Sequence, residues 1–167
     1  RYAMSESADL RQRFEAAMMA NYGVPPLALA RGEGSRGWDA DGNRYLDLIG
    51  GIAVSALGHA HPAIVDAVTR QVATIAHTSN LFCHEQVITL AEKLVSLLGG
   101  NGRAFFANSG TEANEAAIKF ARKTGKVLDP SGEKYELVSF HGSFHGRTMG
   151  ALSATPNPKY QKPFAPM

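Results

Sequence analysis

A short polar turn, Asn108 to Thr111, separates an apolar run from a strongly helical segment. The N-terminus of a helix presents unpaired N–H groups and the positive end of the helix dipole, and both attract anions. Gly110 lets a ligand come close to the backbone, and the hydroxyl groups of Ser109 and Thr111 can donate further hydrogen bonds. The turn therefore predicts an anion site formed by Ser109, Gly110 and Thr111.

A second interpretation of this turn needs no ligand. Ser109 and Glu112 form the capping-box pattern S-x-x-E in front of an apolar-periodic run. On spacing alone, a helix cap explains the turn as well as an anion site does, because serine and glycine are common where a strand leads into a helix. The turn lacks the lysine and the spacing of a P-loop and does not match G-x-G-x-x-G, so we expect no nucleoside triphosphate or dinucleotide site.

A second group of residues suited to binding lies in the segment 140–148, FHGSFHGRT. Phe144 can stack on a planar ligand. Arg147 can hold a carboxylate through two parallel hydrogen bonds. The simpler alternatives are loop packing for Phe144 and a surface ion pair for Arg147, which is the commoner role of a lone arginine.

The histidines of the chain do not form a convincing metal site. His141 and His145 stand four residues apart, a spacing that suits metal binding when it lies on a helix, but Gly142 and Gly146 argue against a helix there. The two histidines of the segment 58–62, GHAHP, have no framework of cysteine or carboxylate ligands around them. We interpret them as turn or packing residues and expect no metal.

Helices and strands are expected to alternate in the second half of the chain. The expected elements are a helix over 9–22, short strands within 27–51, helices over 62–75 and 85–98, a strand over 104–107, a helix from Ser109 to a C-cap at Gly125, and a strand over 134–140. Strand, helix and strand in succession predict a parallel α/β layer, in which ligands bind at the carboxyl ends of the strands. The predicted fold class is therefore α/β, with a smaller α+β segment in front.

The helix expected after the polar turn carries an apolar stripe that we expect to be buried. The stripe consists mostly of alanine, which lets a helix lie close to a sheet. Its members are Ala113, Ala116, Ala117, Phe120 and Ala121. Glu115 and Lys119 are spaced for a favourable i,i+4 ion pair.

The composition of the 167 residues, 44% apolar and 19% charged, is that of an ordinary globular protein. The charges are interspersed and sum to +2, so we expect no nucleic-acid partner. No apolar run approaches the ~20 residues that span a bilayer, so we expect no membrane insertion. The single cysteine, Cys83, cannot form an internal disulfide, which favours a reducing cytoplasm. The proline-rich segment 154–167 has no capping element, so we expect the chain to be part of a longer protein.

Two segments together resemble the class III pyridoxal-phosphate aminotransferases: NSGTEANEAAIKFAR and FHGRTMGALSAT. Four more match the N-terminal half of these enzymes, in register: NYGVPPLALARGEG, DGNRYLDLIGGIAVSALGHAHP, HTSNLFCHE and NPKYQKPFAPM. The resemblance covers nearly the whole chain and implies a fold type I architecture. Residues 1–60 would belong to the small domain, and residues 61–167 would begin the large cofactor-binding domain. A homodimer is implied as well.

The same resemblance assigns roles to both groups of residues. In the family, the Ser-Gly-Thr turn holds the phosphate of pyridoxal 5'-phosphate, which corresponds to Ser109, Gly110 and Thr111. The aromatic residue of the second motif packs on the pyridine ring, and its arginine binds the substrate carboxylate, which corresponds to Phe144 and Arg147. We expect no catalytic residue in this chain, because the family's Schiff-base lysine and the aspartate on the pyridine nitrogen belong to its second half.

For the whole enzyme, the resemblance implies amino-group transfer between N2-acetylornithine and 2-oxoglutarate, in cytoplasmic arginine biosynthesis. Ornithine, 4-aminobutyrate and succinyldiaminopimelate are alternative amino donors, because the front half of such enzymes does not fully separate them. The alternative from another function class is a non-catalytic chain that binds only an anion or a partner subunit.

Overall fold

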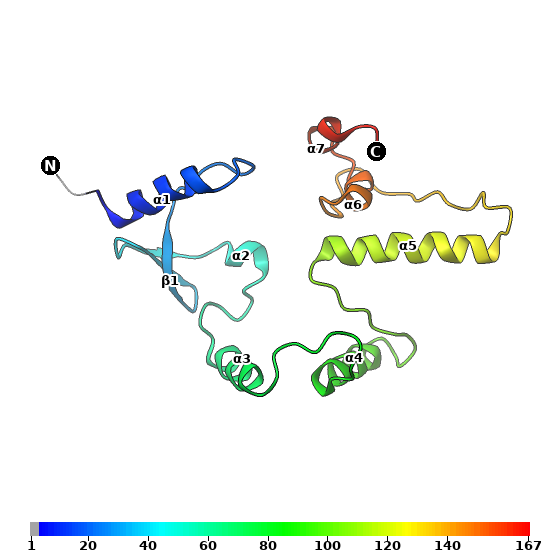
Figure 1. Cartoon of the computed structure of the whole chain (residues 1–167), viewed down its shortest axis with the longest axis horizontal. Coiled ribbons are helices and arrows are strands. Elements are labelled where there is room, and N and C mark those ends of the chain that lie inside the picture. The colour runs from blue at the N-terminus through cyan, green and yellow to red at the C-terminus, as the bar shows by residue number, and fades with distance from the viewer. Residues whose placement is uncertain (1–3) are drawn as a thin grey trace. The chain divides into compact units, whose positions relative to one another are not determined.

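The computed structural model describes residues 4–167, which form two units that meet in sequence between Phe82 and Cys83 (Figure 1). The structure is a helix-rich α/β chain with a small antiparallel sheet. The division predicted at residue 60 concerns the domains of a longer enzyme and stays a prediction. None of the helices in these residues is long and apolar enough to cross a membrane.

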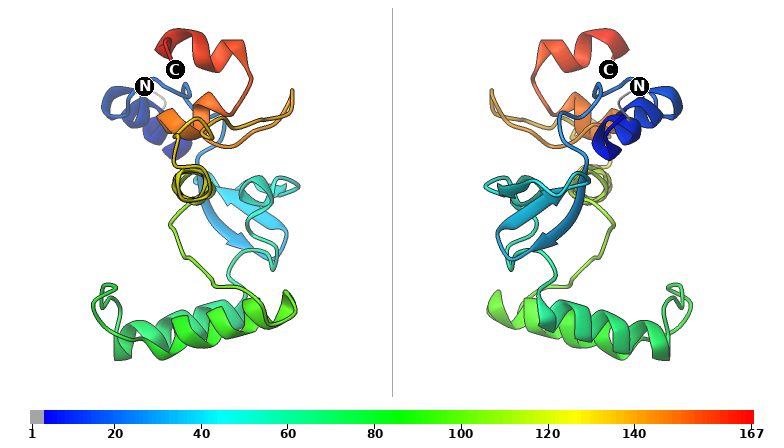
Figure 2. Two further views of the ribbon diagram at one scale, coloured as in Figure 1. Left: turned by 90° about the vertical axis from the view of Figure 1, so that its right-hand side faces the viewer. Right: turned by 90° about the vertical axis from the view of Figure 1, so that its left-hand side faces the viewer.

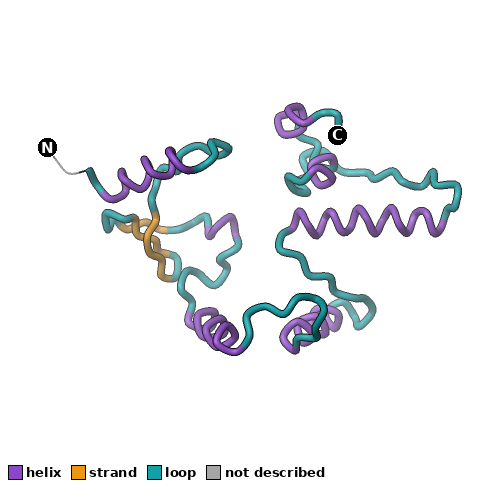
Figure 3. Tube along the Cα trace, in the orientation of Figure 1, coloured by secondary structure: helices purple, strands orange, loops and turns teal. Residues whose placement is uncertain are grey.

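The first unit contains a three-stranded sheet. Its elements are α1 (Glu6–Ala17), β1 (Leu29–Glu33), β2 (Arg36–Asp39), β3 (Arg44–Leu46), α2 (Gly50–Ala53) and α3 (Pro62–Thr74). The strands are antiparallel in the order β1-β2-β3, with Gly32 opposite Gly37. Figure 3 shows the short strands (orange) that were predicted within 27–51 and the helix predicted to begin at Pro62, so both predictions are confirmed.

Asp39 holds the turn between β2 and β3. Its buried carboxylate accepts hydrogen bonds from the backbone N–H and side-chain amide of Asn43, the N–H of Asp41 and the hydroxyl of Tyr45, at 2.8 to 3.1 Å. These bonds, above all the one from the Asn43 side chain, hold the pKa of Asp39 below its usual value. Asp41 accepts a further bond from the N–H of Ser7 at 3.2 Å, so the turn also holds the first residues of α1.

Asp47 holds a strained segment after β3. The strain lies at Ile52 and Ala53, whose φ values of 63° and 61° favour glycine, and it is greater at Ile52 because that residue is β-branched. One oxygen of Asp47 accepts the N–H groups of Ile49 and Gly50, each at 2.9 Å, and the other lies 2.7 Å from Nε2 of His59. These contacts, led by the Gly50 N–H, hold the pKa of Asp47 below its usual value. A single carboxylate thus joins the strained segment to the following loop.

The second unit contains four helices and a 3₁₀ turn in the described residues: α4 (Glu85–Leu97), α5 (Gly110–Leu128), α6 (Met149–Ser153), α7 (Pro158–Gln161) and Lys162–Phe164. α4 follows its prediction and is closed by Gly99 and Gly100, both with positive φ. α6 contacts both α5 and α7, and Figure 2 shows α6 and α7 (orange to red) on the same side of α5. The most deeply buried side chains are Ala151, Leu152 and Thr155, so the small core of this unit lies around α6.

Two predicted strands are not formed. Residues 104–107 and 134–140 run as loops (teal in Figure 3). The apolar side chains of Val138 and Phe140 are 94% and 84% exposed. Sequence patterns describe a segment's own residues, whereas a strand also needs a neighbouring backbone to bond. The predicted parallel sheet is therefore absent from the part of the chain that the structure describes.

α5 continues beyond its predicted end. It runs past Gly125 to Leu128, and Asp129 is its C-cap. Gly125 is buried inside the helix, where its missing side chain leaves room for the carbonyl group of Lys134. A Cβ at this position would collide with that carbonyl. The prediction of a C-cap at Gly125 is wrong, because this glycine serves a close approach of backbone instead.

The face of α5 that contacts α6 is the more polar one. The half-buried residues on this face are Thr111, Asn114, Glu115 and Ile118. The alanine stripe stays largely exposed, and Phe120, its largest member, is 62% exposed. The burial predicted for that stripe is therefore not seen in residues 4–167, because the sheet that would cover it is not formed there.

Candidate functional site

The predicted cap at the start of α5 is present. Ser109 is the N-cap, and its Oγ accepts a hydrogen bond from the N–H of Glu112 at 3.3 Å. The Glu112 carboxylate accepts the backbone N–H of Asn108 at 2.6 Å and its side-chain amide at 3.4 Å. Ser109 and Glu112 thus form a capping box whose return bond reaches one residue further upstream than usual.

This cap leaves donors free for an anion. Within residues 4–167, the backbone N–H groups of Gly110 and Thr111 donate no hydrogen bond. Ser109 acts only as an acceptor in the cap, so its hydroxyl hydrogen stays available for a second bond. A Cβ built on Gly110 would meet no atom within 4 Å, so a ligand can reach the N-terminus of this 19-residue helix. The helix cap and the anion site are therefore compatible.

The second predicted motif packs directly on this turn. Gly146 is buried with a φ of 135°, and a Cβ on it would collide with the side chain of Thr111. Nδ2 of Asn114 donates to the carbonyl of His145 at 2.6 Å. The N–H of His145 donates to Oγ1 of Thr155 at 2.9 Å. The structure therefore brings together the two groups of residues that the sequence singled out.

Glu115 joins α5 to the start of α6. Its Oε1 accepts a short hydrogen bond from the Thr148 hydroxyl and a bond from the N–H of Ala151 at 3.1 Å. Because the Thr148 hydroxyl donates to Glu115, its oxygen accepts the hydrogen bond from the Thr111 hydroxyl, at 3.0 Å. These bonds, led by that from Thr148, hold the pKa of Glu115 below its usual value, so the group is ionised at neutral pH. The predicted ion pair with Lys119 is not formed, because the carboxylate faces α6.

Arg147 and Phe144 remain available to a ligand. The guanidinium carbon of Arg147 lies 4.0 Å from the ring centroid of Tyr160 and 5.9 Å from that of Phe144. Arg147 is exposed and forms no ion pair with any residue that the structure describes. The Phe144 side chain is 63% exposed and so is not taken up by loop packing. Both side chains lie on the loop that packs against the Ser-Gly-Thr turn.

His59 and His61 have local structural partners. Nδ1 of His61 accepts the N–H of Ala63 at 3.3 Å and so caps α3. His59 pairs with Asp47, as described above. In the residues that the structure describes, no group of three or more His, Cys, Asp or Glu side chains is arranged to hold a metal ion. Both histidines thus act as the predicted turn and packing residues.

Sequence reasoning missed the residues that join the two motifs, Asn114, Glu115 and Thr148. It also missed Thr155 and Tyr160, which contact the second motif. One signal was available in the sequence. Asn114 and Glu115 follow Thr111 by three and four positions, so the three residues share one face of the helix. That polar face lies opposite the alanine stripe and could have been proposed as the contact to the second motif. Tyr160 offered no such signal, because it lies in a separate short helix.

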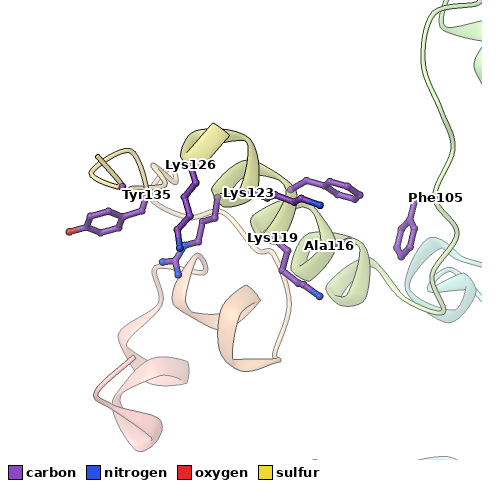
Figure 4. A pocket seen from close by; sticks show the side chains of 9 residues that line it. Phe105, Ala116, Lys119, Lys123, Lys126 and Tyr135 are labelled. Atoms are coloured by element: carbon purple, nitrogen blue, oxygen red, sulfur yellow. The ribbon is translucent and has the colours of Figure 1, made fainter. Parts of the chain in front are cut away.

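A cavity of about 850 Å³ lies along another side of α5 (Figure 4). Its lining is aromatic and basic and includes Phe105, Phe120, Tyr135, Lys119, Lys123 and Lys126. None of the candidate site residues lines it. Phe105 and Tyr135 belong to the two segments that were predicted as strands. The cavity therefore marks the uncovered side of the helix and is separate from the candidate site.

Comparison with known proteins decides the family. The family described as aminotransferase class-III matches residues 17–167. This chain belongs to the class-III aminotransferases. It is 54% identical over 167 residues to the acetylornithine aminotransferase of Mycobacterium tuberculosis (strain ATCC 25618 / H37Rv), an alignment that covers 99% of this chain and 40% of the relative.

Solved structures place this class-III aminotransferase chain in fold type I, which confirms the predicted fold class. The N-acetylornithine aminotransferase from Stenotrophomonas maltophilia K279a is 42% identical with a TM-score of 0.70, over 76% of this chain and 35% of that chain. An (S)-enantioselective omega-transaminase from Thermomicrobium roseum is 31% identical with a TM-score of 0.83, over 98% of this chain and 39% of that chain. The chain spans about 40% of the length of the curated relatives it matches. Class-III aminotransferases depend on pyridoxal phosphate.

Proposed function

We propose that this chain is the N-terminal portion of an aminotransferase that moves an amino group from N2-acetylornithine to 2-oxoglutarate with pyridoxal 5'-phosphate. The observation that carries the proposal is the packing of Gly146 on Thr111, which brings the turn proposed to bind the phosphate close to the loop that contains Arg147. The 54% identity to an acetylornithine aminotransferase supports the choice of amino donor. Residues 1–60 then belong to the small domain of the enzyme, and residues 61–167 begin its large domain.

Ser109, Gly110 and Thr111 fit the phosphate of the cofactor. The free N–H groups of Gly110 and Thr111 and the hydroxyl of Ser109 are donors, as a phosphate requires, whereas the hydroxyl of Thr111 already donates to that of Thr148. The positive end of the α5 dipole favours the phosphate charge. The absence of a Cβ at Gly110 leaves the approach open. In this proposal the three residues bind and orient the cofactor without taking part in bond breaking.

Phe144 and Arg147 would contact the ring and the substrate. Phe144 packs on the planar pyridine ring, for which its exposed ring is suited. Arg147 receives the substrate carboxylate through two parallel hydrogen bonds, since its guanidinium has no carboxylate partner in the described chain. When bound, the cofactor supplies the electron sink for this class of reaction. No catalytic residue is assigned to this chain.

The remaining parts of the proposal concern the whole enzyme. We propose a cytoplasmic homodimer in arginine biosynthesis. Ornithine, 4-aminobutyrate and succinyldiaminopimelate are the alternative amino donors. The turnover of N2-acetylornithine compared with that of ornithine, measured on the whole enzyme, distinguishes the first choice from its nearest alternative.

Gly110→Ala tests whether the turn binds phosphate or only caps the helix. Alanine is a better helix former than glycine, and the added methyl group meets no protein atom. In an enzyme of the relatives' length that carries this chain, the variant should therefore fold as well as wild type. A phosphate at the turn would meet the methyl group, so we expect about tenfold weaker cofactor binding, roughly 1.4 kcal/mol.

The measurement is a titration with pyridoxal phosphate followed by its visible absorbance. Thr124→Ala, a change to alanine at an exposed position of the same helix, is the control and should leave the affinity unchanged. Unaltered cofactor affinity in Gly110→Ala would mean that the turn is only a helix cap, and it would contradict the proposed phosphate site.

A further inference from the structure

Arg147 lies against an aromatic ring that neither predicted motif contains. Its guanidinium carbon is 4.0 Å from the ring centroid of Tyr160, well inside the ~6 Å range of cation–π attraction. The ring of Phe144, at 5.9 Å, is at the edge of that range. Tyr160 is therefore the principal aromatic partner of this arginine.

This contact leaves the binding edge of Arg147 open. The N–H donors of a guanidinium lie in its plane and point outward, whereas stacking uses its face. Arg147 is exposed and forms no ion pair with any residue in 4–167. A carboxylate can therefore reach the edge of the guanidinium while the ring of Tyr160 holds its face.

The ring of Tyr160 has a fixed support. Its helix, α7, is anchored on α6 by Nε2 of Gln161, which donates to the carbonyl groups of Leu152 and Ser153 at 3.1 and 3.2 Å. Asn157 caps α7 by accepting the N–H of Lys159 at 3.0 Å. Because Leu152 is buried, the position of α7 is tied to the core of the second unit.

We propose that Tyr160 is a positioning residue that orients Arg147 for the substrate carboxylate. An exposed arginine loses side-chain entropy when it binds, and a guanidinium already held by a ring loses less. The inference rests on the proposed function, in which Arg147 binds the carboxylate. It adds that recognition of this carboxylate depends on an aromatic ring at position 160, outside both motifs.

Tyr160→Leu tests the proposal in an enzyme of the relatives' length that carries this chain. The KM for 2-oxoglutarate should rise about two- to tenfold, the factor that corresponds to the cost of immobilising one long side chain on binding. The value of kcat and the affinity for pyridoxal phosphate should change less than about twofold. Tyr160→Phe keeps the ring and should restore a KM near that of wild type. Tyr160→Gln, which has no ring, gives the same test if the leucine variant does not fold.

Two further variants separate the outcomes. Tyr135→Leu makes the same change at a tyrosine away from Arg147 and should leave KM unchanged. Arg147→Lys should raise KM more than Tyr160→Leu does, because lysine cannot form the bidentate pair.

If Arg147→Lys raises KM and Tyr160→Leu does not, the positioning role is overturned while the proposed function stands. If Arg147→Lys leaves KM unchanged, the proposed role of Arg147 itself fails. If Tyr160→Leu and Tyr160→Phe both lower kcat, weaken cofactor binding and raise KM to the same extent, Tyr160 is a structural residue and the inference is overturned.

Discussion

Removal of the Glu115 carboxylate should loosen the start of α6. In Glu115→Ala, the Thr148 hydroxyl and the N–H of Ala151 lose their acceptor, and Ala151 is fully buried. A hydrogen bond to a charged group contributes about 1.5–3 kcal/mol. Both bonds share one oxygen of a half-buried carboxylate, so we expect a total loss near the lower end, about 2 kcal/mol. Glu115→Gln keeps the oxygen and loses only the charge, so we expect about 1 kcal/mol.

Hydrogen exchange followed by mass spectrometry measures this loss locally. The protein is an enzyme of the relatives' length that carries this chain, and the observed peptide covers residues 148–155. An opening free energy lower by about 2 kcal/mol makes exchange roughly thirtyfold faster in Glu115→Ala, and about 1 kcal/mol makes it roughly fivefold faster in Glu115→Gln. Glu92→Ala, at an exposed carboxylate of α4, is the control and should change nothing in this peptide.

Two results would refute the reasoning. Unchanged exchange of residues 148–155 in Glu115→Ala would mean that the carboxylate is only a solvated neighbour of α6. Equal acceleration in Glu92→Ala would mean that the effect is a general loss of stability rather than the loss of two named hydrogen bonds.

The other predictions concern pH and a buried glycine. Folding lowers the pKa of Glu115 from its ordinary value of 4.5, so its stabilisation is present above that value and is lost as pH falls through the folded value. Exchange of residues 148–155, corrected for the intrinsic rate, should therefore accelerate below about pH 4.5 in wild type and much less in Glu115→Gln. Gly125→Ala should lower stability by about 1–3 kcal/mol despite the better helix propensity of alanine, because the new Cβ would meet the Lys134 carbonyl. The measurement is the Tm of Gly125→Ala compared with that of Thr124→Ala, a control that should not lower Tm.

Local chemistry explains which elements were predictable. The start of α5 follows from Ser109 and Glu112, because a capping box needs only residues within one turn of each other. Pro62 and Gly99 mark a helix start and a helix end for the same reason. The free donors of the candidate site were predictable as well, since a serine and a glycine at a helix start are visible in the sequence.

Contacts between distant positions explain what was not predictable. In the sequence, a glycine that a carbonyl approaches closely, as Lys134 approaches Gly125, looks the same as a glycine that ends a helix. The segment 134–140 has the composition of a strand, but its pairing depends on a backbone outside the segment. The stacking of Arg147 on Tyr160 depends on how α7 returns to α6, which no local rule describes. Sequence therefore predicted local features such as the helix cap better than the contacts that hold the candidate site residues in place.

The hydrogen bond between the hydroxyls of Thr111 and Thr148 joins positions 37 residues apart. Between them the chain runs along α5 and then returns as a loop, and residues 129–133 lie at the far end, the tip, of this segment. Since both ends of this segment are held together, the entropic cost of closing a longer loop at its tip grows only slowly with the number of added residues. The tip is therefore a natural place for inserted sequence, such as a fluorescent reporter, which would sit at the far end of the helix from the site that it reports on.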